Sequence, residues 1–445
     1  MSLNFNKNIT TIIAVLTICF TFSSYAHGVD TLHHTIHSYF AERLKSADEE
    51  QHLIPFEGKR TIKHNEITAV RAAVWQQWKK QLLSDDSLPA ATAPQPEELP
   101  PLYQWELKKE NPMPFYFIRK GDGRSKTHAM FLNLHGSGPK AHEFRNTFAW
   151  TMRYEDRPSI YFIPQIPSEQ RYRWWFKPVQ YAWERLFRLA MVQEDIDPNR
   201  LYVMGISEGG YGSQRLAAFY ADYLAGAGPM AGGEPLQNAP PLNFRHIAFS
   251  LQTGENDRGF GRNTLTNEAK LAFEKLAAAN PGEFIHKIEL QPNRGHGIDY
   301  TVTTPWLIHY NRIPHPKHIS WVLFPMDGRY RKAFYNIALN RPLDIREGDE
   351  FDRAVFEIRY QGNTVYITAE LMDSKMESRK KLSHLDMAIF LDSQYVDLKK
   401  KVKVVVNDKV LFHNKIPLNL AHMVESCAIF GDPERVFPAK IDVRL

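Results

Sequence analysis

Short apolar runs alternate with helix-like segments from residue 103 to about residue 300, and this alternation constrains the fold more than any other feature of the sequence. The runs at residues 129–134 and 159–164 are apolar at almost every position, which is typical of strands buried on both faces. Strands that alternate with helices predict a mostly parallel sheet whose two faces are covered by helices. We therefore expect an α/β fold in this part of the chain.

The individual elements follow from the spacing of the apolar residues. Spacings of three and four residues predict helices, and short apolar runs between turn-forming residues predict strands. The expected strands are residues 129–134, 159–164, 201–204, 225–229, 247–253 and 284–290, and the expected helices are residues 174–192, 209–223 and 267–279.

Two segments of different character flank the α/β region. Residues 31–83 show helical spacing, and residues 84–101 hold five prolines, which cannot sustain a helix. We expect a helical N-terminal cover with a proline-rich linker at residues 27–101, an α/β domain at residues 102–342 and a small C-terminal β domain at residues 343–445. Alternating runs between turn residues predict the strands of this last domain at residues 354–360, 364–371, 385–391, 402–406 and 410–412.

The first 26 residues have the pattern of a secretory signal peptide. Lys7 precedes an apolar stretch at residues 9–22, and Ser24 and Ala26 are the small residues that a signal peptidase reads. The stretch is shorter than the about 20 residues that span a bilayer. We therefore expect cleavage after Ala26 and an exported protein, periplasmic or secreted.

The cysteines, the charge balance and the absence of known motifs disfavour several other classes of protein. Ile18 stands where a lipoprotein signal requires a small residue, which disfavours lipid anchoring at Cys19. Without Cys19 the exported chain keeps only Cys427, so no intrachain disulfide is expected. Lys and Arg (55) exceed Asp and Glu (50) by only 5, without a long basic run, so we expect no nucleic-acid surface. The sequence shows no zinc-ligand spacing and no phosphate-binding loop, and we expect neither a metal nor an organic cofactor.

A serine motif stands between an expected strand and an expected helix. The segment Gly205-Ile206-Ser207-Glu208-Gly209 fits G-x-S-x-G, which in this context predicts a sharp turn that exposes the serine hydroxyl at the edge of the sheet. The glycines remove clashes around the serine, and the amino terminus of the helix favours a developing negative charge. We expect Ser207 to be a nucleophile.

A second glycine-rich turn, His135-Gly136-Ser137-Gly138, directly follows the run at residues 129–134. Such a turn presents backbone N–H groups to an anion. We expect the N–H groups of Glu208, Gly136 and Ser137 to form an oxyanion hole. A plain tight turn, with His135 buried for packing, is the alternative.

A serine nucleophile needs a base and an acid that orients the base. His296 lies in a glycine-flanked loop after the last expected strand, and we expect it to be the base. The acid should stand between serine and histidine in the chain, after the strand at residues 247–253. Asp257 is the expected acid, and Glu255 in the same turn is the alternative.

An aromatic and basic loop follows the strand at residues 159–164. Arg173, Trp174 and Trp175 in this loop suit stacking on a sugar or a phenolic acyl group. We expect them to bind substrate, with simple packing at the start of the next helix as the alternative.

The order of Ser207, Asp257 and His296 resembles that of the α/β-hydrolase family over roughly residues 103–300. More narrowly, the HGSG, GISEGGYG, GEND and GHG segments are similar to those of secreted polyhydroxybutyrate depolymerases, feruloyl esterases and dienelactone hydrolases. The segments after Trp306 are similar to exported bacterial hydrolases with a C-terminal β extension. The chain departs from the secreted depolymerases because it lacks cysteines for disulfides near the site.

The resemblance implies an α/β-hydrolase fold and a serine hydrolase that cleaves carboxylic esters, with polysaccharide-linked acyl or aromatic esters as the expected substrates. The same triad cleaves amides, so an exported serine peptidase of the prolyl-oligopeptidase type is one alternative. Residues 27–102 are too few for the propeller of such peptidases, which disfavours it. A non-catalytic carbohydrate-binding protein on this fold is the other alternative.

Overall fold

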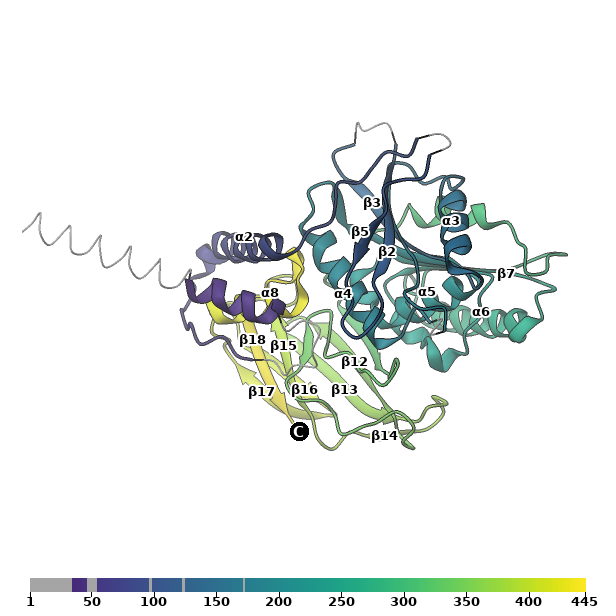
Figure 1. Cartoon of the computed structure of the whole chain (residues 1–445). Coiled ribbons are helices and arrows are strands. Elements are labelled where there is room, and N and C mark those ends of the chain that lie inside the picture. The colour runs from purple at the N-terminus through teal and green to yellow at the C-terminus, as the bar shows by residue number, and fades with distance from the viewer. Residues whose placement is uncertain (1–33, 46–53, 96–97, 122–124, 171–172) are drawn as a thin grey trace, which may run out of the picture.

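An eight-stranded, mostly parallel sheet forms the centre of the α/β part of the protein. The computed structural model describes residues 34–45, 54–95, 98–121, 125–170 and 173–445. The strands are β1 (Tyr103–Trp105), β2 (Met113–Lys120), β3 (His128–Leu134), β4 (Ser159–Pro164), β5 (Ile196–Ile206), β6 (Gly226–Met230), β7 (Ala248–Gly254) and β8 (His286–Gln291). Their order is β1-β2-β4-β3-β5-β6-β7-β8, with β3 to β8 parallel to one another and β2 antiparallel to β4. This is the order of the α/β-hydrolase fold, and the expected fold class is confirmed. Figure 1 labels β2, β3, β5 and β7 of this sheet.

Helices cover both faces of this sheet. Along β3, Met130 and Leu132 belong to the apolar core that contains Leu186 and Leu216 of the helices on one face. Phe131 belongs to the core on the other face, with Phe144. Since successive side chains of a strand point to opposite faces, both faces are buried and the strands are apolar almost throughout. The helices are α4 (Lys177–Val192), α5 (Glu208–Phe219) and α6 (Arg262–Ala279) on the first face, and α3 (Lys140–Thr151) and α7 (Thr303–Leu307) on the second.

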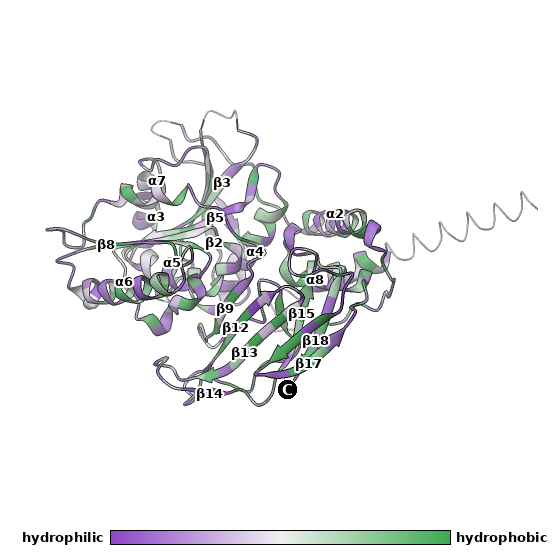
Figure 2. Ribbon diagram, turned by 180° about the vertical axis from the view of Figure 1, so that it is seen from behind, coloured by the Kyte–Doolittle hydropathy of each residue, from purple (hydrophilic) through white to green (hydrophobic). Residues whose placement is uncertain are grey.

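The C-terminal part forms two further sheets, and green apolar and purple polar residues alternate along their strands (Figure 2). The larger sheet has the order β17-β16-β13-β12-β9 with β14 paired to β13, and the smaller has the order β10-β11-β15-β18. The strands are β9 (His318–Leu323), β10 (Ala333–Phe334), β11 (Ile337–Leu339), β12 (Arg353–Gln361), β13 (Thr364–Met372), β14 (Arg379–Lys381), β15 (Asp386–Leu391), β16 (Val402–Val406), β17 (Lys409–Asn414) and β18 (Ala439–Arg444).

The expected turns in this part are confirmed, but its sheets begin earlier than residue 343. Gly362, Asn407 and Asp408 have positive φ angles of 54°, 45° and 69°, as tight hairpin turns require. β9, β10 and β11 precede residue 343, yet β9 pairs with β12 and β11 pairs with β15. The sheets of the C-terminal part therefore start at His318, and residue 342 does not separate them from the large sheet.

The N-terminal helices lie against the C-terminal part. A helix over residues 34–45 is followed by α2 (Ile67–Asp85), which packs on α8 (Leu420–Phe430), as Figure 1 shows. Arg71 of α2 binds Asp392 at 3.0 Å. The helical character expected here is confirmed, and what α2 covers is α8. The expected signal peptide at residues 1–26, including Cys19, lies outside the described residues. In the part of the chain that the structure describes, no helix has the length and apolar character to cross a membrane.

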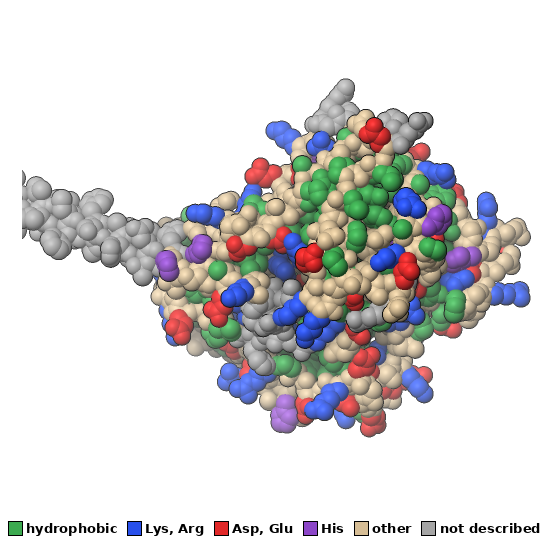
Figure 3. Space-filling view, viewed as in Figure 1, with side chains coloured by type: hydrophobic (Ala, Val, Ile, Leu, Met, Phe, Trp, Pro, Cys, Tyr) green, Lys and Arg blue, Asp and Glu red, His purple; other side chains and the backbone are tan. Residues whose placement is uncertain are grey.

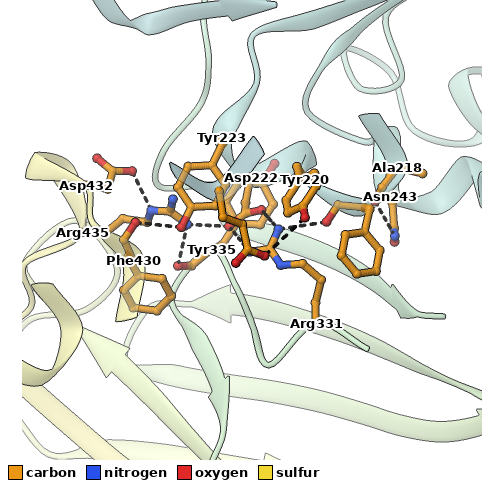
Figure 4. Close-up of polar contacts among 12 residues, drawn as sticks. Ala218, Tyr220, Asp222, Tyr223, Asn243, Arg331, Tyr335, Phe430, Asp432 and Arg435 are labelled. Carbon is orange, nitrogen blue, oxygen red and sulfur yellow. Dashed lines mark hydrogen bonds and ion pairs between the residues drawn. The ribbon is translucent and has the colours of Figure 1, made fainter. Parts of the chain in front are cut away.

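A buried chain of ion pairs joins the α/β domain to the C-terminal part (Figure 4). Asp222, just after α5, binds Arg331 at 2.8 Å and Arg435 at 2.6 Å. Arg435 also binds Asp432 at 2.6 Å, and Asp432 binds Arg312. We call these five residues the Asp222 network. Because the network crosses between the two parts, it connects the buried interior of the α/β domain with that of the C-terminal part.

Candidate active site

Ser207 lies in the sharp turn between β5 and α5. Its φ and ψ angles are 58° and −114°, a sparsely populated conformation for a residue with a side chain. The Ser207 N–H donates to the carbonyl oxygen of Met230 at 2.9 Å, and the Ser207 carbonyl oxygen accepts from the Tyr211 N–H at 3.0 Å. The neighbouring strand and the first turn of α5 therefore hold this strained backbone in place.

The glycines around Ser207 are needed because backbone segments approach one another closely. A Cβ atom at Gly209 would lie 2.0 Å from the carbonyl oxygen of Leu134 at the end of β3. A Cβ atom at Gly205 would lie 2.6 Å from the Gly209 backbone. These contacts explain the G-x-S-x-G spacing by packing: β3 and the first turn of α5 could not approach each other if either position carried a side chain.

His296 and Asp257 meet Ser207 at this edge of the sheet. The Nε2 atom of His296 is 3.1 Å from the Oγ atom of Ser207, and its Nδ1 atom is 2.8 Å from the Oδ2 atom of Asp257. The His296 side chain is 45% exposed, whereas that of Asp257 is 3% exposed. Three residues that lie far apart in the chain thus form one hydrogen-bonded path from a half-exposed hydroxyl to a buried carboxylate.

The loops after β7 and β8 are joined, which fixes His296 relative to Asp257. The N–H of Asn256 donates to the carbonyl oxygen of Arg294 at 2.8 Å. A Cβ atom at Gly254 would lie 2.0 Å from the carbonyl oxygen of Gly295, so only glycine permits this approach. Tyr300 completes the support, since its hydroxyl donates to the carbonyl oxygen of His296 at 3.0 Å.

Asp257 is held by a residue that the sequence did not single out. Arg262, at the start of α6, donates from Nε to Oδ2 at 2.8 Å and from Nη2 to Oδ1 at 2.6 Å. Burial alone would raise the pKa of Asp257, but hydrogen bonds from Arg262 and His296 outweigh burial and lower it. Asp257 therefore stays ionised at neutral pH. Arg262 belongs to no motif, and only the fold brings it to the carboxylate.

Glu255, the alternative acid, points elsewhere. Its carboxylate accepts from the N–H of Asn293 at 3.0 Å, and the residue is exposed. It stabilises the turn after β8. Between the two acidic candidates, Asp257 is the one in contact with His296.

The glycine-rich turn after β3 lies beside Ser207. A Cβ atom at Gly136 would lie 3.4 Å from the Cβ atom of Ser207, so the Gly136 backbone is at van der Waals distance from the serine, and Ser137 beyond it is exposed. Glu208 is the first residue of α5, where backbone N–H groups have no acceptor within the helix. Of the three residues expected to donate to an oxyanion, Glu208 is adjacent to Ser207 in the chain, Gly136 is adjacent to it in space, and Ser137 follows Gly136.

His135 is buried and anchors this turn. Its Nε2 atom accepts from the N–H of Ile166 at 3.0 Å, and its Nδ1 atom lies 2.8 Å from the carbonyl oxygen of Gly136. Burial lowers the pKa of His135 to about 4. His135 is therefore a neutral structural group, with its proton on Nδ1.

Trp174 is a support for the same turn, and the expectation that it binds substrate is wrong. Its side chain is completely buried against Gly212, and its indole N–H donates to the carbonyl oxygen of His135 at 3.0 Å. A residue enclosed in this way cannot reach a substrate. Trp174 instead packs at the start of the next helix, which was the alternative expectation.

Arg173 contacts the residue that follows Ser207, and Trp175 lies against two arginines. The side chain of Arg173 is 47% exposed and its Nη1 atom is 3.3 Å from the Oε1 atom of Glu208, which follows Ser207. Trp175 is partly exposed, and the guanidinium of Arg215 lies 4.0 Å from its ring centroid. Arg215 in turn binds Glu234 at 2.6 Å. Trp175 and the two arginines, each paired with a glutamate, form a charged and aromatic rim beside Glu208, the residue that follows Ser207.

Across the described ranges, from residue 34 to residue 445 with their gaps, no group of three or more His, Cys, Asp and Glu side chains is arranged to hold a metal ion.

Comparisons with known proteins give likeness in fold only. No family model matches the chain, and no curated protein matches it. A thermostable esterase is 18% identical with a TM-score of 0.35 over 47% of this chain, and the match spans 63% of that enzyme. Est1E from Butyrivibrio proteoclasticus is 12% identical with a TM-score of 0.36, covering 47% of this chain and 96% of its own. A ferulic acid esterase from Anaeromyces mucronatus is 13% identical with a TM-score of 0.33, covering 50% of this chain and 96% of its own.

Proposed function

We propose that the protein is a serine hydrolase that cleaves carboxylic esters, with Ser207 as nucleophile, His296 as general base and Asp257 as the acid that orients the base. The observation that carries the proposal is the hydrogen-bonded path from Ser207 to Asp257, with distances of 3.1 and 2.8 Å at the two nitrogens of His296. The strained backbone of Ser207 supports it, because such strain is typical of sites where geometry serves chemistry.

In this proposal His296 removes the hydroxyl proton while the Oγ atom of Ser207 attacks the acyl carbon. The carbonyl oxygen takes up the negative charge, which the N–H groups of Glu208 and of Gly136 and Ser137 stabilise. His296 then donates the proton to the leaving alcohol, the ester C–O bond breaks, and an acyl-enzyme forms. Water, activated by His296, releases the carboxylic acid. Asp257 keeps the imidazole in the required tautomer and stabilises its charged form.

We further propose that the substrates carry a ring or a sugar near the ester, as in polysaccharide-linked acyl or aromatic esters. The charged and aromatic rim, in which Arg173 and Trp175 lie beside Glu208, supports this substrate class. Arginine and tryptophan side chains of this kind stack on flat or apolar ring faces. Trp174 has no part in it.

Export is also part of the proposal and rests on the sequence of residues 1–26. The mass of the mature protein recovered from the producing cells tests it. A chain that begins at His27 agrees with the proposal, and a chain that keeps residues 1–26 contradicts it.

The test of the reaction uses a matched ester and amide of the same aromatic acid. We expect the specificity constant for the ester to exceed that for the amide, and Ser207→Ala to lower ester turnover by about 10³-fold or more. An amide constant equal to the ester constant would instead identify a serine peptidase. A folded wild-type protein that turns over neither compound but is retained on a polysaccharide would identify a binding protein.

A further inference from the structure

A glutamate carboxylate lies beside the glycine-rich turn that follows β3. Glu143 is in the first turn of α3, and a Cβ atom at Gly138 would lie 2.8 Å from its Oε1 atom and 2.9 Å from its Cγ atom. A Cβ atom at Gly136 would lie 3.4 Å from the Oε2 atom of Glu143 and 3.4 Å from the Cβ atom of Ser207. The Glu143 side chain therefore fills space that the two glycines leave, and its carboxylate lies close to the proposed nucleophile.

The charge of this carboxylate is not cancelled by a described residue. None of the described residues forms an ion pair with Glu143 or a hydrogen bond with its carboxylate. Partial burial raises the pKa of Glu143, and the neighbouring His142 opposes this rise less strongly. Glu208, on the other side of Ser207, differs because it pairs with Arg173 at 3.3 Å. Glu143 therefore adds a net negative charge next to the proposed site.

This charge lies where it affects the proposed reaction. The N–H groups of Gly136 and Ser137 are proposed to hold the oxyanion, and the Glu143 carboxylate lies against the same turn. Two charges separated by several ångströms in a partly buried site interact appreciably. The carboxylate therefore disfavours the oxyanion of a neutral or anionic ester, and a positive group on the substrate would offset this repulsion.

The charge of the rest of the protein gives no strong preference of its own. The formal net charge of the whole chain is only +5. Acidic and basic side chains are mixed over the face of the molecule that Figure 3 shows. A weak overall field leaves the selection of charged substrates to groups close to the reacting atoms.

We propose that Glu143 is a specificity-determining residue, which favours esters with a positively charged group near the ester bond and disfavours esters with a carboxylate there. The inference rests on the proposed ester hydrolysis and deepens it by naming the charge of the substrate. Esters whose ring carries an ammonium group combine this charge with the ring proposed above.

Three methyl benzoates test the proposal, with trimethylammonium, tert-butyl or carboxylate as the para substituent. The first two groups have nearly the same shape and differ in charge. The assays are run at pH 8, well above the ordinary glutamate pKa of about 4.3, so that Glu143 is ionised. The kcat/KM of each charged ester is divided by that of the tert-butyl ester, which removes any effect common to all three.

In Glu143→Gln we expect the ratio for the trimethylammonium ester to fall about fivefold and the ratio for the carboxylate ester to rise about fivefold. Glu143→Asp keeps the charge and should keep most of the wild-type preference. Glu370→Gln is the matched control, since it removes the same charge from β13 in the C-terminal part, and it should leave both ratios unchanged. High salt should reduce the wild-type preference, because it screens charge without changing the shape of the site.

Two results would overturn the proposal: ratios in Glu143→Gln equal to those of the wild type, or a change by one common factor for all three esters, which would indicate a purely structural role. Either result leaves the proposed ester hydrolysis intact, because the wild type still turns over the tert-butyl ester. A folded wild type that hydrolyses none of the three esters would overturn the ester hydrolysis itself, and the inference with it.

Discussion

The guanidinium of Arg262 contacts both oxygens of the Asp257 carboxylate, at 2.8 Å from Nε to Oδ2 and 2.6 Å from Nη2 to Oδ1. The same Oδ2 atom faces Nδ1 of His296 at 2.8 Å. Arg262 therefore holds both oxygens of the acid of the proposed triad, one of which also contacts the histidine. Arg262 does not reach the reacting atoms, and we regard it as a positioning residue.

Replacing Arg262 by methionine should lower kcat about a hundredfold, because the Asp257 carboxylate loses its fixed position. The pKa of Asp257 should rise once the lowering contribution of Arg262 is gone. Activity should then be lost at a higher pH on acidification than in the wild type. The pH dependence of kcat/KM measures this, and Arg262→Lys should restore part of the wild-type profile. An unchanged profile in Arg262→Met would contradict the positioning role.

The choice of Asp257 over Glu255 leads to a second prediction. Asp257→Asn should lower turnover by about 10⁴-fold, because the amide stabilises the wrong imidazole tautomer. Glu255→Gln should have a mild effect, since the Glu255 carboxylate binds the Asn293 N–H and not His296. Steady-state kinetics with one aryl ester compares the two variants. A larger loss in Glu255→Gln would assign the acid to Glu255.

Gly209→Ala should destabilise the protein, although alanine is normally the better helix residue by about 1 kcal/mol. The added methyl group would lie 2.0 Å from the carbonyl oxygen of Leu134, and we expect a loss of about 2 kcal/mol or more in the free energy of unfolding. Gly295→Ala is the matched control, because a Cβ atom there has no neighbour within 4 Å. Urea unfolding compares them, and equal midpoints for the two variants would refute the packing account of the motif.

The Asp222 network should make stability depend on pH. Burial would raise the pKa values of Asp222 and Asp432, but their arginine partners outweigh burial and lower both. The stabilisation is therefore complete above the ordinary aspartate pKa of about 4 and is lost as the pH falls below it. Arg435→Met, which leaves both carboxylates with fewer partners, should cost about 3–5 kcal/mol at pH 7 and less at acidic pH.

Denaturant unfolding at a series of pH values measures this effect. Arg444→Met serves as the surface control, and it should change the free energy of unfolding by less than about 1 kcal/mol at every pH. A cost of Arg435→Met that stays constant from pH 7 to below pH 4 would show that the carboxylates are not the source of the effect.

The large sheet and the meeting of Ser207, Asp257 and His296 could be predicted because both depend on local patterns. Strands buried on both faces are recognisable as apolar runs, and loops that follow parallel strands meet at one edge of the sheet. Ser207, Asp257 and His296 each follow a parallel strand of this sheet. The sequence therefore predicts that the three residues lie close together.

Other features depend on contacts between distant residues, which no local pattern reveals. The residues of β9 do not indicate that its partner is β12 and not a strand of the large sheet. In the sequence Trp174 resembles an exposed loop residue. Its contacts with Gly212 and His135 in the fold show that its side chain is enclosed. Arg262 and the Asp222 network likewise gain their roles from partners elsewhere in the fold.

The most direct test of the proposed nucleophile is reaction with a fluorophosphonate, followed by peptide mapping of the adduct. The account predicts one covalent phosphonyl group on Ser207 of the wild type, no labelling of Ser207→Ala, and strongly slowed labelling of a folded His296→Ala variant. Labelling of Ser207→Ala at the wild-type rate, or an adduct on a different residue, would contradict the account.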